Sequence, residues 1–161
     1  MTSSSLRLRG LTVAAVWVGC AVQMPAQAAL GEMRSLPAAS APASTGAQRS
    51  VAAMARYTVQ EDLRPDGSRV REYLAPDGRV FAVSWNTLYK PNLSVMLGQS
   101  FPTYATAAQQ AALRGGIQRQ FRHDNSELVV VSTGHLNVFS GHAYLRSLWP
   151  QGLSPQALGW E

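Results

Sequence analysis

The chain has 161 residues, which suits one domain of ordinary size, and its 14 Lys+Arg against 9 Asp+Glu give a net charge of +5. Apolar residues make up 46% and charged residues 14%, a globular rather than a disordered composition. One Cys excludes a disulfide framework and Cys-rich metal modules, and no apolar run approaches the roughly 20 residues of a membrane-spanning helix. These figures limit the class of protein without selecting an activity.

The N-terminus has the three parts of a secretory signal peptide. Arg7 and Arg9 precede the apolar stretch LTVAAVWVGCAV, and Ala26-Gln27-Ala28 has the A-x-A pattern of a cleavage site. The sequence therefore predicts a signal peptide at 1–28, cleavage after Ala28, and a mature chain that has lost the one Cys and two of the arginines. The exported chain is expected in the periplasm or outside the cell, with no transmembrane span.

Cys20 offers an alternative route of processing. Gly19-Cys20 is typical of the end of a lipoprotein cleavage box, but the bulky Trp17 stands where such boxes carry an aliphatic residue. Lipidation at Cys20 is therefore the second interpretation of this segment.

The segment after the cleavage site is poor in large apolar side chains. The run LPAASAPASTGAQ at 36–48 cannot bury enough surface to offset its loss of conformational entropy. We predict a flexible Ala/Ser/Pro-rich segment at 29–50 and a single small β-rich domain at 51–161.

Two Pro-Asp-Gly turns organise the first part of this domain. They begin at Pro65 and Pro76, and Gly supplies the positive φ that such hairpin loops use. The segments between them are short and rich in Val, Tyr and Phe, so we predict a three-stranded antiparallel meander. Its strands are expected at Arg56–Leu63, Arg69–Leu74 and Arg79–Trp85.

The turns also suggest a register. Pairing Leu74 with Val80 puts Tyr73 opposite Phe81, and the first hairpin then opposes Val59 with Tyr73 and Glu61 with Arg71. Strand alternation gathers one apolar face, on which Arg71 also lies with Glu61 as its nearest acidic neighbour. The residues of this predicted core face are Val59, Leu63, Tyr73, Phe81, Val83 and Trp85.

The second part of the domain alternates between helix and strand signals. Asn92 to Leu97 forms a short predicted helix with Asn92 as N-cap and Gly98 as its end, and a longer one begins with Ser100 as N-cap and ends at Gly115-Gly116. Strands follow at Gln118–His123, Glu127–Ser132 and Leu136–Ser140, with a hairpin turn at Thr133-Gly134 and the LVVV run buried on both faces. Ser154-Pro155-Gln156 begins a short terminal helix. The expected fold is α+β, dominated by antiparallel sheet with one or two short helices.

Several segments together resemble a known family. They are Ala29-Leu30-Gly31, Val70-Arg71-Glu72-Tyr73, the run from Asp77 to Trp85, Leu97-Gly98, Ser132 to His135, and Gly141-His142-Ala143-Tyr144. The chain resembles the bacterial domain-of-unknown-function family numbered 2844, whose members look like short secreted proteins. It departs from the family pattern after Trp85, where Asn86-Thr87-Leu88-Tyr89 replaces a more Gly-Pro-like loop. The resemblance brings no activity, substrate or catalytic residue.

The sequence does not show a set of residues at catalytic or metal-binding spacing. His135 and His142 are seven residues apart without an acidic neighbour between them, and no G-x-S-x-G elbow or phosphate loop is present. The carboxylates of Glu61, Asp62 and Glu72 stand among arginines, so ion pairing explains them better than glycoside hydrolysis. We assign no catalytic, cofactor-binding or metal-binding residue.

Arginine and aromatic residues of the meander form the feature that best indicates binding. Such side chains on a sheet bind anionic glycans or nucleic acids through charge and stacking, and export argues against nucleic acid. The alternative is that the aromatic residues belong to the core and the arginines solvate the sheet edges. The candidate ligand-surface residues are Arg69, Arg71, Trp85, His135 and His142.

These observations favour a non-catalytic binding or assembly module of the bacterial envelope or extracellular space. Its partner would be another envelope protein or an anionic glycan. The alternative is a small secreted hydrolase that acts on an envelope glycan or peptide. A flat exposed patch favours binding, whereas convergent polar side chains in a deep pocket favour hydrolysis.

Overall fold

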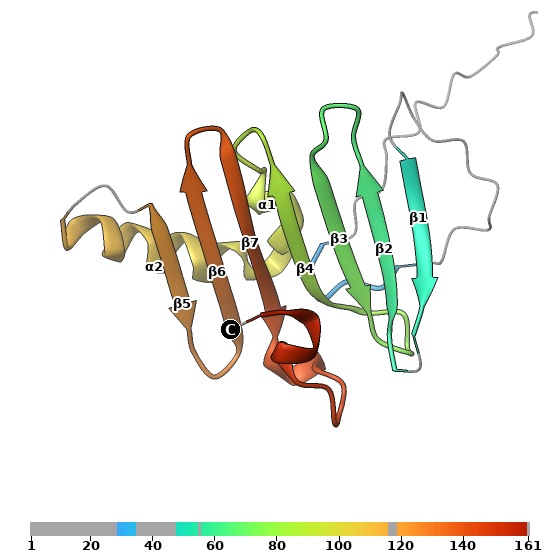
Figure 1. The fold of residues 1–161 in the computed structure, drawn as a ribbon. Coiled ribbons are helices and arrows are strands. Elements are labelled where there is room, and N and C mark those ends of the chain that lie inside the picture. Colours follow the sequence, from blue (N-terminus) through green and yellow to red (C-terminus); the bar gives the residue numbers. More distant parts are fainter. Residues whose placement is uncertain (1–28, 35–47, 55, 116–118, 161) are drawn as a thin grey trace, which may run out of the picture.

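Seven strands form one antiparallel sheet in the computed structural model, which describes residues 29–34, 48–54, 56–115 and 119–160 (Figure 1). The strand order is β1-β2-β3-β4-β7-β6-β5, so the meander β1–β4 and the meander β5–β7 join where β4 pairs with β7. This confirms the predicted small α+β fold dominated by antiparallel sheet. The strands are β1 (Gln48–Ala53), β2 (Thr58–Leu63), β3 (Arg69–Leu74), β4 (Val80–Thr87), β5 (Gln120–Asp124), β6 (Leu128–His135) and β7 (Val138–Leu145).

Two helices lie against one face of the sheet, where α2 runs behind the strands from β5 to β4 in Figure 1. Three short 3-10 turns complete the helical elements: one follows α1, one follows β7, and one lies near the C-terminus. The last two belong to a C-terminal segment on the opposite face of the sheet, near the lower end of β7 in Figure 1. We call the side that α1 and α2 cover the helix face. The opposite side, which carries the C-terminal segment and the groove described below, is the groove face. The helical elements are α1 (Leu93–Leu97), 98–100, α2 (Phe101–Leu113), 146–148 and 155–158.

The two Pro-Asp-Gly turns form as predicted. Gly67 and Gly78 have φ values of 82° and 84°, the left-handed conformation that a residue with a Cβ rarely adopts. In each turn the Asp side chain accepts a hydrogen bond from a backbone N–H two residues later, that of Ser68 at 2.8 Å and that of Arg79 at 3.0 Å. These Asx bonds stabilise the turns that set the meander.

The register of the first hairpin is as predicted, but β4 contains a bulge. Leu74 does pair with Val80, yet Tyr73 pairs with Ala82 rather than with Phe81, because Phe81 is the extra residue. The predicted core face is therefore wrong beyond this point. Tyr73 and Phe81 share the groove face, whereas Val83 and Trp85 lie in the other hydrophobic cluster, on the helix face.

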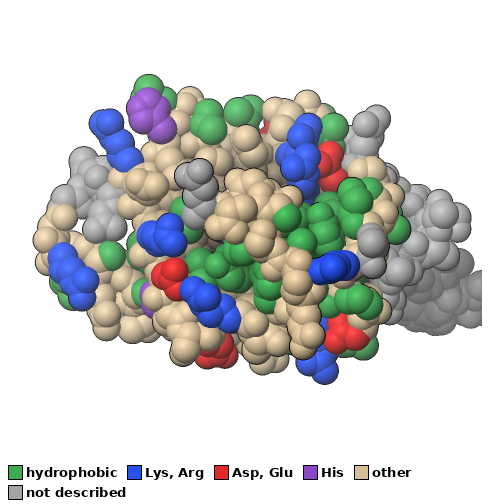
Figure 2. All heavy atoms as spheres, turned by 60° about the horizontal axis from the view of Figure 1, so that its bottom comes forward, with side chains coloured by type: hydrophobic (Ala, Val, Ile, Leu, Met, Phe, Trp, Pro, Cys, Tyr) green, Lys and Arg blue, Asp and Glu red, His purple; other side chains and the backbone are tan. Residues whose placement is uncertain are grey.

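The first half of β4, from Val80 to Val83, is buried on both faces, which explains why period-two alternation did not reveal the bulge. The helix face carries a cluster that Leu30, Leu93 and Leu97 complete from outside the sheet. The groove face carries an aromatic cluster over which the C-terminal segment folds, with Trp149 against Phe81 at 5.2 Å between ring centroids. The buried members of the aromatic cluster are Tyr73, Phe81, Ala82, Val129, Tyr144 and Trp160. Figure 2 brings the lower end of Figure 1, where the C-terminal segment lies, toward the viewer, and hydrophobic side chains gather there with basic side chains around them.

Residues before Val51 also belong to the folded unit. Leu30 is 2% exposed, and its N–H donates to the carbonyl of Met96 at 3.0 Å, while Met33 forms a bridge with Arg79. The strand β1 begins at Gln48. The predicted flexible segment 29–50 therefore does not describe 29–34 or the start of β1. Burial of Leu30 and backbone hydrogen bonds hold 29–34 on the domain, and backbone pairing with β2 defines β1. The remaining part of the predicted segment, 35–47, lies outside the described residues.

The second meander follows the predicted strands with a shifted turn. The turn residues are Leu136 and Asn137, both at positive φ, rather than Thr133-Gly134, so β6 continues to His135. Likewise β7 reaches Leu145 rather than ending at Ser140. Leu128 to Val130 of the LVVV run are buried on both faces as predicted, with Val130 in the helix-face cluster and Val129 in the aromatic cluster, whereas Val131 is half-buried.

The helix ends are partly as predicted. The Asn92 side chain accepts from the N–H of Val95 at 3.4 Å, and α1 ends at Gly98. Ser100 makes no side-chain cap, because it belongs to a 3-10 turn that leads directly into α2. The short terminal helix at Pro155–Leu158 is confirmed.

The predicted signal peptide, its cleavage site and Cys20 lie outside the described residues. Among the residues described, no helix is long and apolar enough to cross a membrane.

Candidate functional site

A shallow groove of about 360 Å³ crosses the groove face of β3, β4, β7 and β6. It lies beside the C-terminal segment, which covers only one end of these strands (Figure 1). Four of the five candidate residues from the sequence line it, although they are far apart in the chain. The lining residues are Arg69, Arg71, Ser84, Trp85, Asn86, Val131, Thr133, Ser140, Gly141, His142 and Trp160.

Two arginines on β3 form the charged wall of the groove. Arg71 donates from Nε to Glu61 at 2.5 Å, and the Nε of Arg69 lies 3.5 Å from the other oxygen of the same carboxylate. This ion pairing, with Glu61 opposite Arg71 in the register, is as predicted. Because one carboxylate faces two guanidinium groups, the wall keeps a net positive charge. The arginine side chains are 46% and 40% exposed, so their remaining N–H donors are open to a ligand.

Hydroxyl and amide side chains form the floor. Alternation within each strand brings Ser84 and Asn86 of β4 to the groove face, and the register sets Asn86 opposite Ser140 of β7. Ser140 in turn lies opposite Thr133 of β6. The result is a row of neutral donors and acceptors across three strands, next to the arginines.

His142 and Trp160 close the groove at the end nearest the C-terminal segment. Their rings stack with centroids 4.6 Å apart and planes 4° from parallel. Burial, with a smaller contribution from the charge of Arg122, lowers the pKa of His142 from 6.5 to about 4. The imidazole is therefore neutral near pH 7, and the positive charge of the groove comes from the arginines.

Trp85 lies at the groove but does not offer its ring there. Its indole belongs to the helix-face cluster with Leu93 and Leu97 and is 3% exposed. It passes across Gly141, where any Cβ would clash with the ring. The proposal that Trp85 is a stacking surface is therefore wrong, and the alternative, that this aromatic residue belongs to the core, is correct.

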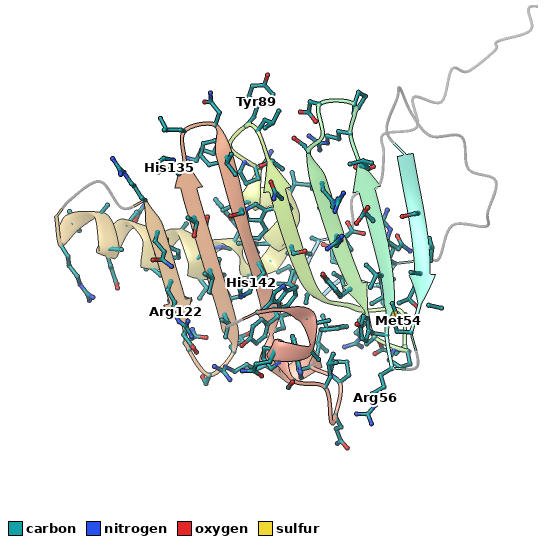
Figure 3. All side chains as sticks on the ribbon, viewed as in Figure 1. Met54, Arg56, Tyr89, Arg122, His135 and His142 are labelled. Carbon is teal, nitrogen blue, oxygen red and sulfur yellow. The ribbon has the colours of Figure 1, made fainter. Side chains whose placement is uncertain are left out.

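His135 lies away from the groove. It is the exposed last residue of β6, next to the β6–β7 turn, whereas His142 is inside β7 (Figure 3). Within the described part of the chain, no three His, Cys, Asp or Glu residues stand close enough to hold a metal ion.

The predicted carboxylate cluster is divided by the sheet. Glu61 pairs with the groove arginines, while Glu72 forms an ion pair with Arg34 on the helix face. Successive strand residues point to opposite faces, so Glu61 and its neighbour Asp62 also point apart. Asp62 and Glu72 share the helix face and, with Glu61, line a cavity there together with Arg34 and Arg64, so arginines accompany these carboxylates as the sequence predicted.

Ser84 lies opposite His142 in the β4–β7 register, which makes it a candidate nucleophile with a base beside it. Among the described residues, no carboxylate orients this imidazole, and the Ser84 hydroxyl lies 3.4 Å from the hydroxyl of Tyr73. A pKa near 4 also makes His142 a weak base at neutral pH. The groove is better equipped to bind than to catalyse.

Sequence reasoning missed Ser84, Asn86, Ser140 and Trp160. The first three are single polar residues in strands whose pairing is non-local, so nothing in the sequence joins them. Trp160 follows a short terminal helix that the sequence did indicate. The sequence did not indicate that this segment folds back and stacks Trp160 on His142.

The family match covers residues 26–158, and the family is described as a protein of unknown function, DUF2844. The chain belongs to this family. The match spans every described strand and helix, so the resemblance of the sequence motifs is confirmed. Neither the curated proteins nor the solved structures contain a match to the chain.

Proposed function

We propose that this DUF2844 protein is an exported, non-catalytic binding module whose groove takes an anionic glycan. The observation that carries the proposal is the pairing of two exposed guanidinium groups, opposed by one carboxylate, with a floor of hydroxyl and amide side chains. Arginines recognise carboxylate or phosphate groups through charge-assisted hydrogen bonds. Neutral donors and acceptors match the hydroxyl groups of a sugar ring.

The groove is open, which suits a polymer. It crosses four strands of a sheet and is bounded at one end by the His142–Trp160 stack. A chain that lies in it can continue beyond the floor, whereas a closed pocket would exclude all but a terminal unit. Export supports the same class of ligand, because envelope and extracellular glycans are reachable after signal cleavage.

The binding experiment uses polygalacturonate, which carries one carboxylate on each sugar, and neutral dextran as the uncharged comparison. We expect the mature protein to bind polygalacturonate at about 50 mM NaCl and to lose affinity at about 500 mM, where charges are screened beyond about 4 Å. Dextran should bind much more weakly. Equal binding to both polymers would contradict the proposal.

Three variants locate the binding. The double substitution Arg69→Gln/Arg71→Gln should weaken binding about tenfold, or about 1.4 kcal/mol. The control Arg79→Gln/Arg114→Gln removes the same charge from exposed positions outside the groove and should change affinity little. Glu61→Gln should strengthen binding, because it releases both guanidinium groups from their carboxylate. Equal losses in the two double variants would show nonspecific charge attraction and refute the groove as the site.

The export part of the proposal has its own measurement. The A-x-A pattern at 26–28 motivates cleavage after Ala28. N-terminal sequencing of the protein from its native envelope should therefore begin at Ala29. A lipid-modified Cys20 as the first residue would replace this with the lipoprotein interpretation.

A secreted hydrolase is the second candidate, and the position of Ser84 opposite His142 favours it. A hydrolase screen on envelope glycans and peptides tests it. Turnover that is abolished by Ser84→Ala and by His142→Gln would replace the binding proposal. Absence of turnover in a protein that still binds polygalacturonate supports binding as the function.

A further inference from the structure

A separate cavity of about 230 Å³ lies on the helix face, over β2, β3 and β4. The β4–α1 connection borders it, and the exposed side chains of Tyr89 and Lys90 stand at its rim (Figure 3 labels Tyr89). No residue lines both sites, although Glu61, whose carboxylate pairs with the groove arginines, also borders this cavity. Its inner lining includes Gln60, Arg34, Glu72, Val70, Val83 and Met96.

Gln60 is the unusual residue of this cavity. It is 3% exposed, and among the described residues neither its amide nitrogen nor its amide oxygen has a hydrogen-bond partner. A buried amide without partners destabilises a protein, and nearly all buried polar side chains are paired. The volume is several times the roughly 30 Å³ that one water occupies, so the site is large enough for a small molecule.

The remaining lining indicates a ligand without net charge. Arg34 and Glu72 form an ion pair in which the side chains are 9% and 12% exposed, so the two charges deep in the cavity balance each other. The other charged lining residues also balance in sign: Arg64 and Lys90 against Glu61 and Asp62. Val70, Val83 and Met96 supply apolar walls. A charged ligand would lose its hydration here without gaining an unbalanced opposite charge.

The amide of Gln60 sets the hydrogen-bonding pattern. Its oxygen accepts and its nitrogen donates, side by side and in one plane. The complementary group has an adjacent donor and acceptor in one plane, as in a primary amide or a lactam. Such an edge forms two parallel hydrogen bonds with a glutamine side chain, as bases do in nucleic-acid recognition.

We propose that this cavity is a binding site for a small neutral molecule that presents a primary-amide or lactam edge to Gln60. The flat group attached to that edge packs between the apolar walls, and its outer end reaches the rim at Tyr89. This site is independent of the glycan groove, so either can fail without the other.

The test uses benzamide for the primary amide and uracil for the lactam, with saturation-transfer NMR as the readout of binding. Two matched compounds serve as controls: N,N-dimethylbenzamide, which lacks the N–H donor, and benzoate, which carries a charge. We expect transfer to benzamide, to uracil or to both, and weak transfer to either control. No transfer to benzamide and uracil, or equal transfer to N,N-dimethylbenzamide, would overturn the proposal.

The variant Gln60→Met separates a ligand site from a structural role. It keeps the length of the side chain and removes the unpartnered amide, so it should abolish transfer while raising the melting temperature of the ligand-free protein. Gln110→Met, at an exposed position of α2, is the control and should leave transfer unchanged. A lower melting temperature in Gln60→Met would mean that the amide has a partner within the protein, and it would refute the inference.

Discussion

The two faces of this sheet are built from the same strands but hold sites of opposite character. The groove face is open and carries two arginines against one carboxylate, so it has a net positive charge. The helix face holds a smaller cavity in which Arg34 and Glu72 form an ion pair beside the amide of Gln60, which has no partner among the described residues. The first suits an anionic polymer and the second a small neutral molecule.

Strand alternation separates the charges of the two sites. Arg71 and Glu72 are neighbours in the chain, yet Arg71 pairs with Glu61 on the groove face and Glu72 with Arg34 on the helix face. A cluster of charges that looks like one site in the sequence is thus two sites in the fold. Each of the following predictions alters one side of this arrangement.

The largest effect is expected at Phe81, which anchors the aromatic cluster below the groove. Phe81 is fully buried at the β4 bulge and packs edge-to-face on Trp149. Phe81→Ala should lower the free energy of unfolding by about 3–5 kcal/mol, as measured by urea denaturation. Val138→Ala, at a position 46% exposed, is the control and should cost much less. Similar losses in the two variants would show that Phe81 is not part of the core.

A smaller loss is expected at Gly141, which lies between the groove and the helix-face cluster. A Cβ there would clash with the Trp85 ring and with the carbonyl of Val131. Gly141→Ala should therefore cost about 1–3 kcal/mol in the same denaturation experiment, because the ring must move. The neighbouring Ser140→Ala lacks this clash. If Gly141→Ala is as stable as Ser140→Ala, the placement of the Trp85 indole on the helix face is wrong.

The third effect is on the pH dependence of stability. The pKa of His142 is about 4 in the folded protein and 6.5 without the fold, chiefly because burial disfavours the charged ring. The unfolded state therefore binds the proton more strongly, so this stabilisation is complete above pH 6.5 and is lost as the pH falls toward 4. His142→Gln should reduce the loss of stability between these pH values by on the order of 1–2 kcal/mol, allowing for solvent screening.

Thermal unfolding of His142→Gln and of the wild type across this pH range measures the effect. His135→Gln is the control, since His135 is exposed at the end of β6. If His142→Gln and the wild type lose stability in parallel, the ring does not have the lowered pKa.

Local signals predicted much of the fold. The Pro-Asp-Gly turns predicted the β2–β3–β4 meander and, through the register of its first hairpin, the Glu61–Arg71 pair. Both predictions succeeded because they depend on residues that are close in the sequence. The bulge at Phe81 escaped prediction because the run from Val80 to Val83 is apolar on both faces, so either register looked equally satisfactory. The strand β1 escaped because its small residues carry no strand pattern, and backbone pairing with β2 defines it.

The candidate site was predictable only in part. The arginines and His142 stood out as charged or titratable residues on strands. Gln60 did not, because a glutamine in a strand looks like a solvent-facing residue until its burial is known. Trp85 was misread for the converse reason, since an aromatic residue beside arginines resembles a binding surface although its ring is in the core.

The central claim, that the two faces hold separate sites with different charge preferences, is tested by mapping two titrations on one ¹⁵N-labelled sample of the mature protein. Trigalacturonate should shift backbone amide signals at Ser84, Asn86 and Ser140, and benzamide should shift those at Gln60, Val70 and Met96, with little overlap between the sets. Shifts from both compounds in the same set of residues, or from trigalacturonate only in the cavity set, would contradict the account.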